Sequence, residues 1–428
     1  MKKSMFNHFV KYHDKYIVFN TLNTTLVLMN QDNYKRYQCT EYFSKDKEEN
    51  IFLYKNGMLV DDEMDERAIV DFDRGHLAYS KAKRHFRILT TTACNARCAY
   101  CYERGVKFIS MTDEIMKKTF EYIKRQTEDV QVFSVTWFGG EPLLNIRSID
   151  YLSKKLSKYA IKKGKMWSAS IVSNGSLIND DIIFKMKSYW NVNAVQITLD
   201  GQRENYNKIK AYVDQTSFEC IIENIKKLCV ADIRTTLRLN FDKRNYEDIM
   251  QLILYLSKEL KEYEHWSMYV YPIFDNVDGS YDEKCISRIV ELEKIIANST
   301  EKSENDIIGL PKYSHGRCVF CSVVGETILP NGDLMKCCRH IGNEPPFANV
   351  SDAIIRYNSN YARWCTPVLP EKCNHCELLP ICQGGCRAEQ LIGQDGCLPR
   401  ARVIDKVLTN YVDNFFCRNT IIGHLLSK

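Results

Sequence analysis

The chain has 428 residues, more than a single hydrophobic core usually holds, so we expect two or three domains. The formal net charge of +5 is spread over 59 basic and 54 acidic residues without a polybasic block, which argues against nucleic acid or an anionic membrane as a partner. No stretch approaches the roughly 18 apolar residues of a spanning helix, and charged residues interrupt the amino-terminal segment, so we expect a cytoplasmic protein without a membrane partner.

Residues 1–85 are expected to form a small separate domain. Two β-rich runs joined by a short turn predict a hairpin, over residues 16–21 and 24–29. Helices are predicted near 31–38 and 63–83, with a short apolar strand, IFLY at 51–54, between them. The domain is interpreted either as a cap on the next domain or as a module that docks a substrate peptide.

From residue 86 to about 305, strand-like runs alternate with helical patterns. The six runs are 86–91, 131–138, 168–174, 194–200, 235–241 and 268–274. One helical pattern covers 112–126, where Thr112 is a capping residue. Six βα repeats predict an α/β fold, a parallel sheet with outer helices closed or partly closed into a (β/α)6 barrel. In such barrels, chemistry gathers at the carboxyl ends of the strands.

Unusual residues directly follow four of these predicted strands. They are Cys94, Cys98 and Cys101 after the first strand, Gly139, Gly140 and Glu141 after the second, Ser173 and Asn174 at the third, and Thr198 with Asp200 at the fourth. Because the carboxyl ends of parallel strands meet at one rim, we expect these residues to form a single site.

The three cysteines after the first strand have gaps of three and two residues. This spacing lets three thiolates converge on one inorganic cluster, whereas a tetrahedral zinc ion normally takes a fourth protein ligand. A 4Fe-4S cube held by three cysteines keeps one iron open for another ligand. Since 18 cysteines in a chain without an export signal do not suggest a disulfide framework, metal binding is the leading interpretation.

CNARCAYC, followed by GGEP after the next strand, resembles the radical S-adenosylmethionine (SAM) enzymes over residues 86 to about 300. The resemblance implies that Cys94, Cys98 and Cys101 hold a 4Fe-4S cluster whose open iron binds SAM, and that reduction by a small redox protein yields a 5′-deoxyadenosyl radical. The residues it implies as cofactor contacts are Tyr100, Gly139, Gly140, Glu141, Ser173, Asn174, Thr198 and Lys210. Lys210 stands where relatives often have arginine, and a solvated surface lysine is the alternative for it.

A second cysteine pattern occupies residues 306–428. It consists of Cys318 and Cys321, then Cys337 after Gly332, then Cys373, Cys376, Cys382 and Cys386, and finally Cys397. PNGD at 330–333 predicts a hairpin tip that returns Cys337 toward Cys318 and Cys321. The pattern resembles the SPASM extension of radical SAM enzymes, which carries two auxiliary 4Fe-4S clusters; a pair of zinc sites is the alternative.

The SPASM resemblance also assigns the ligands and brings the expected number of clusters to three. The first auxiliary cluster would take Cys318, Cys321, Cys337 and Cys386, and the second Cys373, Cys376, Cys382 and Cys397. Sulfatase-maturing relatives have an aspartate directly after the cysteine at the position of Cys337, where this chain has Cys338. Cys338 is therefore a candidate catalytic residue, as a base or a hydrogen donor, or an alternative cluster ligand, or an uninvolved thiol.

Because SPASM-bearing relatives mostly act on peptides, the resemblance implies a radical SAM oxidoreductase that modifies a ribosomally synthesised precursor peptide. We expect an intramolecular cross-link, either a thioether or a carbon–carbon bond. In this interpretation residues 1–85 are a winged-helix, RRE-like domain that recognises the peptide. The alternatives are a sulfatase-maturing, formylglycine-forming enzyme and a non-catalytic metal-binding protein.

Overall fold

The computed structural model describes residues 1–273, 281–300, 308–314 and 318–418. The backbone groups into two compact units. The barrel unit contains residues 78–285 and 318–366, and the terminal unit contains residues 1–77, 286–317 and 367–428. The terminal unit therefore combines both ends of the chain. The sequence predicted three domains, each a continuous stretch of the chain: 1–85, 86–305 and 306–428. These domain ranges remain predictions.

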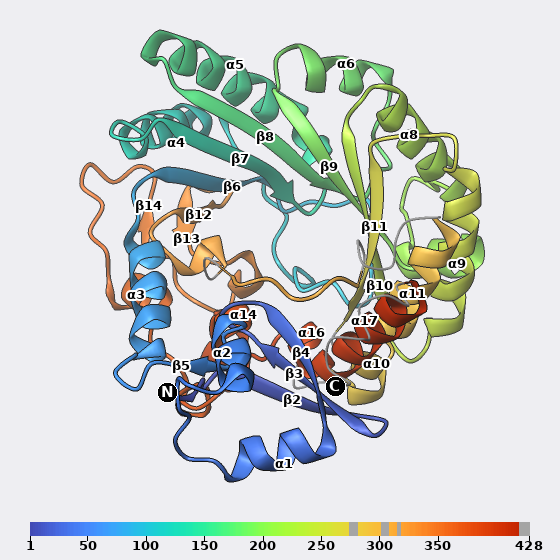
Figure 1. Cartoon of the computed structure of the whole chain (residues 1–428). Helices are drawn as coiled ribbons and strands as arrows, with labels where there is room; N and C mark the ends of the chain where they lie inside the picture. The colour runs from blue at the N-terminus through green and yellow to red at the C-terminus, as the bar shows by residue number, and fades with distance from the viewer. Residues whose placement is uncertain (274–280, 301–307, 315–317, 419–428) are drawn as a thin grey trace. The chain divides into compact units, whose positions relative to one another are not determined.

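Six parallel strands form the core of the barrel unit, each beside its sequence neighbour (Figure 1). They are β6 (Lys83–Thr91), β7 (Val132–Gly139), β8 (Met166–Ser173), β9 (Val192–Leu199), β10 (Arg234–Phe241) and β11 (Trp266–Pro272). Side chains on the face of the sheet that packs against the helices, such as Ile88, Trp137 and Leu237, are fully buried. The predicted α/β fold with a partial (β/α)6 barrel is confirmed; position 274 of the sixth predicted run lies outside the described residues.

Five helices that follow the strands lie on the outer side of the sheet (Figure 1). They are α4 (Asp113–Gln126), α5 (Ile146–Lys163), α6 (Asp180–Ser188), α8 (Phe218–Val230) and α9 (Tyr246–Glu259). Two shorter helices, η1 (Pro142–Asn145) and α7 (Arg203–Lys210), follow β7 and β9. Local chemistry fixes where they begin. Thr112 caps α4 by accepting from the Ile115 N–H, and Ser217 caps α8 by accepting from the Cys220 N–H.

The sheet continues beyond β6 with three strands from the later part of the chain. They are β12 (Gly325–Ile328), parallel to β6, and then β13 (Asp333–Met335) and β14 (Ala348–Asn349), both antiparallel to their neighbours. The predicted turn at 330–333 does join the antiparallel pair β12 and β13. Short helices η2 (Val319–Cys321), η3 (Cys338–His340) and α13 (Ser359–Cys365) surround these strands.

The amino-terminal part of the terminal unit is a small α+β fold. Its elements are β1 (Lys2–Lys3), β2 (Asn7–Tyr12), β3 (Lys15–Asn20), β4 (Thr25–Asn30), α1 (Gln31–Cys39), α2 (Glu48–Lys55), β5 (Leu59–Val60) and α3 (Glu66–Tyr79). The predicted hairpin is β3 and β4. The predicted strand at 51–54 is wrong, because these residues lie within α2, which buries Asn50 and Leu53 on one face. A short apolar run does not by itself distinguish a strand from a buried helix.

The cysteine-rich end of the chain packs against this amino-terminal fold. Ile17 and Phe19 of β3 share a buried cluster with Leu408 and Val412 of the last helix. The elements after residue 285 in this unit are α11 (Ile289–Ser299), η4 (Glu371–Cys373), α14 (Leu379–Cys382), α15 (Arg387–Leu391), α16 (Pro399–Arg402) and α17 (Ile404–Arg418). The short helix α10 (Glu283–Ser287) contains residues assigned to both units. No helix among the described residues meets the length and apolar character that a membrane span requires.

Candidate functional site

The three predicted cluster ligands lie on the loop that follows β6. Cys94 and Cys98 are partly buried and Cys101 is exposed. The Cys98 thiol is an electrostatic neighbour of both the Cys94 and the Cys101 thiols. Burial raises the pKa of Cys94 to about 11, so without metal this thiol is protonated at neutral pH and a metal must displace its proton.

Gly139 and Gly140 bring the end of β7 against the cysteine loop. The Gly140 N–H donates to the Thr91 carbonyl at 3.1 Å, and the Glu141 N–H donates to the Ala93 carbonyl at 2.9 Å. A Cβ atom on Gly140 would lie 2.4 Å from the Ala93 carbonyl oxygen, and Gly139 has φ of 135°. Only glycine fits these two positions, and its absent side chain allows backbone to approach backbone here.

Glu141 joins the loop after β7 to the loop after β8. Its buried carboxylate accepts hydrogen bonds from the Ser173 hydroxyl at 2.9 Å and from the Asn174 N–H at 2.8 Å. The Asn174 side-chain amide then donates to Asn95 Oδ1 at 2.8 Å and approaches Cys94 Sγ at 3.8 Å. Burial raises the pKa of Glu141 to about 7 despite these donors. The loops carrying Glu141, Asn174 and Cys94 are therefore one hydrogen-bonded network.

Lys210 is buried rather than solvated, so the surface alternative for it is wrong. Its Nζ forms an ion pair with Asp200 Oδ2 at 2.7 Å, and both side chains are at most 4% exposed. Asp200 Oδ1 also accepts from the Tyr100 hydroxyl at 2.6 Å and from the Asn240 amide at 3.0 Å. Burial acts to lower the pKa of Lys210, but Asp200 together with Tyr100, Cys98 and Tyr206 outweighs it and holds the pKa well above its usual value. Thr198 lies nearby in sequence, half-buried near the end of β9.

The cysteines expected at the second auxiliary cluster come together in the terminal unit. Cys382 has Cys397, Cys376 and Cys373 as electrostatic neighbours, and burial raises its pKa to about 11. Lys372 Nζ approaches Cys397 Sγ at 3.2 Å, which would stabilise a thiolate there.

Four thiols also gather in the barrel unit beside Arg87. The Cys318 thiol lies close to that of Cys321, and the Cys337 thiol lies close to that of Cys338. Arg87 has Cys338, Cys337 and Cys318 as electrostatic neighbours. Cys386, the fourth ligand that the resemblance assigns to this cluster, belongs to the terminal unit at the start of α15.

The spacing of these thiols bears on the kind of metal centre they could hold. Among the residues that the structure describes, no three His, Cys, Asp or Glu side chains are close enough to hold one metal ion. Thiolates that hold a cube bind separate iron atoms at its corners, so they lie farther apart than the ligands of a single zinc ion.

Three residues at the site were not predicted from the sequence. Asn240 joins the buried network of Asp200 and Lys210, and Arg87 and Tyr102 contact Cys338. Asp200 was expected at the site because it directly follows a barrel strand, but its pairing with Lys210 was not. Arg87 carried no detectable signal, since an arginine inside a strand is normally assigned to the polar face of a sheet.

The comparisons with known proteins concern the family and the fold of the chain. Residues 88–256 match the model of the Radical SAM superfamily. These residues therefore form a radical SAM domain. This domain implies SAM and a 4Fe-4S cluster as cofactors.

Within that class the chain is similar to enzymes with different substrates. It is 25% identical to a GTP 3′,8-cyclase of Clostridium acetobutylicum over 63% of this chain and 86% of the relative. It is 22% identical to a serine-type anaerobic sulfatase-maturating enzyme of Bacteroides thetaiotaomicron over 68% of this chain and 80% of the relative. The structure of Streptococcus suis SuiB bound to precursor peptide SuiA matches with a TM-score of 0.54 and 14% identity, over 94% of this chain and 99% of SuiB. This likeness to SuiB concerns the fold.

Proposed function

We propose that the protein is a radical SAM/SPASM maturase that modifies a ribosomally synthesised precursor peptide by forming an intramolecular thioether or carbon–carbon cross-link. The observation that carries the proposal is the cysteine loop after β6, joined by hydrogen bonds to the loops after β7 and β8 at the carboxyl rim of a radical SAM domain. The likeness of fold to SuiB, solved with a precursor peptide, supports a peptide as the substrate.

Cys94, Cys98 and Cys101 would hold the 4Fe-4S cluster, and the residues of the neighbouring loops would position SAM. When bound, the cluster and SAM supply a 5′-deoxyadenosyl radical that removes hydrogen from the peptide. The role of the protein itself is to orient SAM and the peptide and to exclude water from the site. Tyr100, Gly139, Gly140, Glu141, Ser173, Asn174, Thr198 and Lys210 stay the proposed SAM contacts. Because Glu141 and Lys210 are already satisfied by protein partners, they would act by fixing the loops around SAM.

Two auxiliary clusters would accept the second electron of the reaction. Cys373, Cys376, Cys382 and Cys397 would hold one of them, supported by the mutual proximity of these thiols. Cys318, Cys321 and Cys337 would supply three ligands of the other, for which the resemblance adds Cys386. A small redox protein would supply the electron that starts each cycle.

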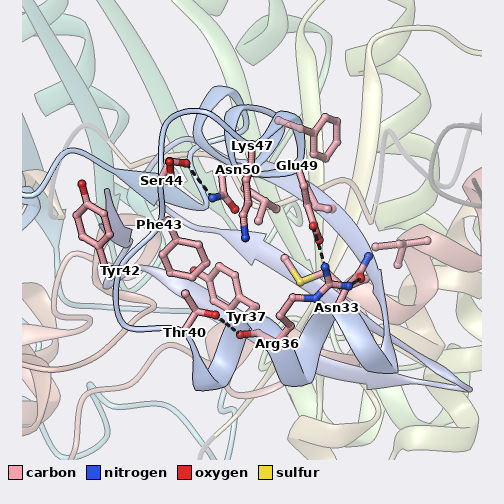
Figure 2. A pocket seen from close by; sticks show the side chains of 15 residues that line it. Asn33, Arg36, Tyr37, Thr40, Tyr42, Phe43, Ser44, Lys47, Glu49 and Asn50 are labelled. Carbon is pink, nitrogen blue, oxygen red and sulfur yellow. Dashed lines mark hydrogen bonds and ion pairs between the residues drawn. The ribbon is translucent and has the colours of Figure 1, made fainter.

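The amino-terminal fold would recognise the precursor peptide. A pocket of about 190 Å³ lies between β4 and helices α1 and α2, and it is floored by buried apolar side chains (Figure 2). The rings of Tyr37 and Phe43 lie 5.4 Å apart in it. β4 is an edge strand of the three-stranded sheet β2-β3-β4. An extended peptide could therefore pair with β4 and place side chains in the pocket.

A sulfatase-maturing, formylglycine-forming activity is the second candidate, because the Bacteroides relative is such an enzyme and matches over 68% of this chain. The cysteine at position 338, where that branch has aspartate, favours the peptide cross-link instead. A non-catalytic metal-binding role is the third, and it predicts no cleavage of SAM.

The deciding experiment is anaerobic reconstitution with iron and sulfide, followed by reduction in the presence of SAM. We expect a brown protein with about twelve iron atoms, from three clusters of four, that releases 5′-deoxyadenosine. Cys98→Ala should abolish that release, because the cluster then lacks a ligand, whereas Cys220→Ala, an exposed thiol on α8, should not change it.

The bond formed would be read from a candidate precursor encoded beside the gene and co-expressed with the enzyme. A cross-link removes two hydrogens per bond, which mass spectrometry detects, and tandem fragmentation locates it. A colourless protein that binds zinc and leaves SAM intact would refute the proposal.

A further inference from the structure

The Arg87 side chain lies in an unusual environment inside the barrel unit. It lies on β6, and its guanidinium is stacked between two aromatic rings, 4.0 Å from the Phe320 centroid and 5.0 Å from the Phe138 centroid. Its Nη1 donates to the Cys338 Sγ at 3.0 Å. A guanidinium enclosed by apolar rings needs a negative partner, and Cys338 is placed to be that partner.

A second donor converges on the same sulfur. The Tyr102 hydroxyl lies 3.6 Å from Cys338 Sγ, and the Cys338 side chain is 5% exposed. Two donors and a nearly buried position indicate a sulfur that is held as an acceptor. Metal-bound thiolates in iron–sulfur proteins have such hydrogen bonds, which tune the reduction potential of the cluster.

The Nε atom of Arg87 supplies an independent observation. It is buried and, within the described parts of the chain, has no hydrogen-bond partner. A buried N–H without an acceptor is costly, so a group at this place should accept from it. The sulfide and thiolate sulfurs of an iron–sulfur cluster are acceptors of the required charge.

The four thiols beside Arg87 form two pairs that belong to one compact unit. Cys318 directly precedes the short helix η2, which ends at Cys321, and Cys337 and Cys338 stand at the start of η3. Consecutive residues of a strand would point to opposite faces, but the chain turns into η3 at this point and both thiols are electrostatic neighbours of Arg87. Both can therefore face the same site.

We propose that Cys338 is the fourth thiolate ligand of the first auxiliary cluster, which it completes with Cys318, Cys321 and Cys337, in place of Cys386. Arg87 is then a positioning residue that orients Cys338 and offsets the negative charge of the cluster. This inference rests on the auxiliary clusters of the proposed function, but it does not depend on the peptide or on the bond formed.

The test uses the full chain with Cys94, Cys98 and Cys101 replaced by Ala, so that only auxiliary clusters assemble. After anaerobic reconstitution, this background should contain about eight iron atoms. Adding Cys338→Ala should lower the content toward about four or leave a three-iron cluster with its own electron paramagnetic resonance signal. Adding Cys386→Ala should leave about eight. Cys365→Ala is the matched control, because Cys365 is a buried thiol of the same unit at 3% exposure.

A second variant, Cys338→Ser, keeps the test decisive if Cys338→Ala does not fold. A serine oxygen can replace a thiolate ligand, so this variant should keep about eight iron atoms and show altered g values and a more negative reduction potential. Cys365→Ser should show neither change. Loss of the first cluster in Cys386→Ala, or unchanged iron content and spectra in both Cys338 variants, would overturn the inference. A background protein without iron would instead refute the clusters themselves.

Discussion

At the scale of single residues, the Lys210–Asp200 pair shows how the site is kept rigid. Both charges are buried, and Asp200 also accepts from Tyr100, which directly precedes Cys101. A buried pair of this kind contributes little net stability, but removing one partner leaves an uncompensated charge. The pair therefore ties the cysteine loop to the end of β9 as long as both members are present.

We predict that Lys210→Met destabilises the metal-free protein by about 3 kcal/mol, because the Asp200 carboxylate is then buried without a cation. The double variant Lys210→Met/Asp200→Asn should recover most of that loss. Chemical unfolding followed by circular dichroism measures both, with Lys208→Met, an exposed lysine of the same helix, as the control. A single variant as stable as the control would show that the pair has no structural role.

Spacing placed Cys94, Cys98 and Cys101 on one loop, and the SPASM resemblance implied the set Cys373, Cys376, Cys382 and Cys397, whose thiols are neighbours in the structure. Neither predicted the partners of these groups. Lys210 pairs with Asp200 ten positions earlier, and Arg87 meets Cys338 from a distant part of the chain. Such contacts depend on tertiary packing, which local sequence patterns do not encode.

At the scale of elements, a buried ion pair fastens β12 to the barrel. Arg84 of β6 contacts Glu326 of β12 at 2.8 Å, and both side chains are at most 8% exposed. The Tyr122 hydroxyl of α4 donates to the same carboxylate. One glutamate therefore connects a strand of the barrel, a strand of the extension and a covering helix.

We predict that Glu326→Gln destabilises the barrel unit by about 3 kcal/mol, because Arg84 then keeps its charge in a buried place without a counterion. Thermal unfolding monitored by circular dichroism should show a lower midpoint. Glu121→Gln, which removes an exposed ion pair with Lys124, is the control and should change stability by less than about 1 kcal/mol. Equal midpoints for the two variants would contradict the prediction.

Elements were predicted well where the periodic pattern of apolar residues extends over many positions, and less well where it covers only a few. All six barrel strands and helix α4 were predicted within a few residues of their observed bounds. The run at 51–54 became part of α2 because the acidic Glu48 and Glu49 suit a helix start and because tertiary contacts bury Leu53. Four apolar residues contain too little pattern to decide this.

At the scale of the whole molecule, the proposed function separates peptide recognition from radical chemistry. The pocket beside β4 belongs to the terminal unit, and the cysteine loop belongs to the barrel unit. Tyr42 lines the pocket and is 69% exposed, so a bound peptide could bury it. Exposed aromatic side chains at binding sites often contribute much of the affinity.

We predict that Tyr42→Ala weakens binding of the unmodified precursor by roughly tenfold, equivalent to about 1.4 kcal/mol, while SAM cleavage without peptide is unchanged. Isothermal titration calorimetry measures the affinity. Phe72→Ala is a matched control, since Phe72 is 71% exposed on α3 and does not line the pocket. Equal affinities for the two variants would show that the peptide binds elsewhere.

The parallel pairing of β12 with β6 has a consequence for how the chain can be divided. Without β12, the first barrel strand would present its backbone N–H and C=O groups along an open edge, and such edges recruit strands from other molecules. A fragment that stops after the sixth barrel strand would thus contain Cys94, Cys98 and Cys101, the proposed ligands of the SAM cluster, and still be prone to aggregate. The carboxyl-terminal extension therefore protects the backbone edge of the first barrel strand from pairing with other molecules.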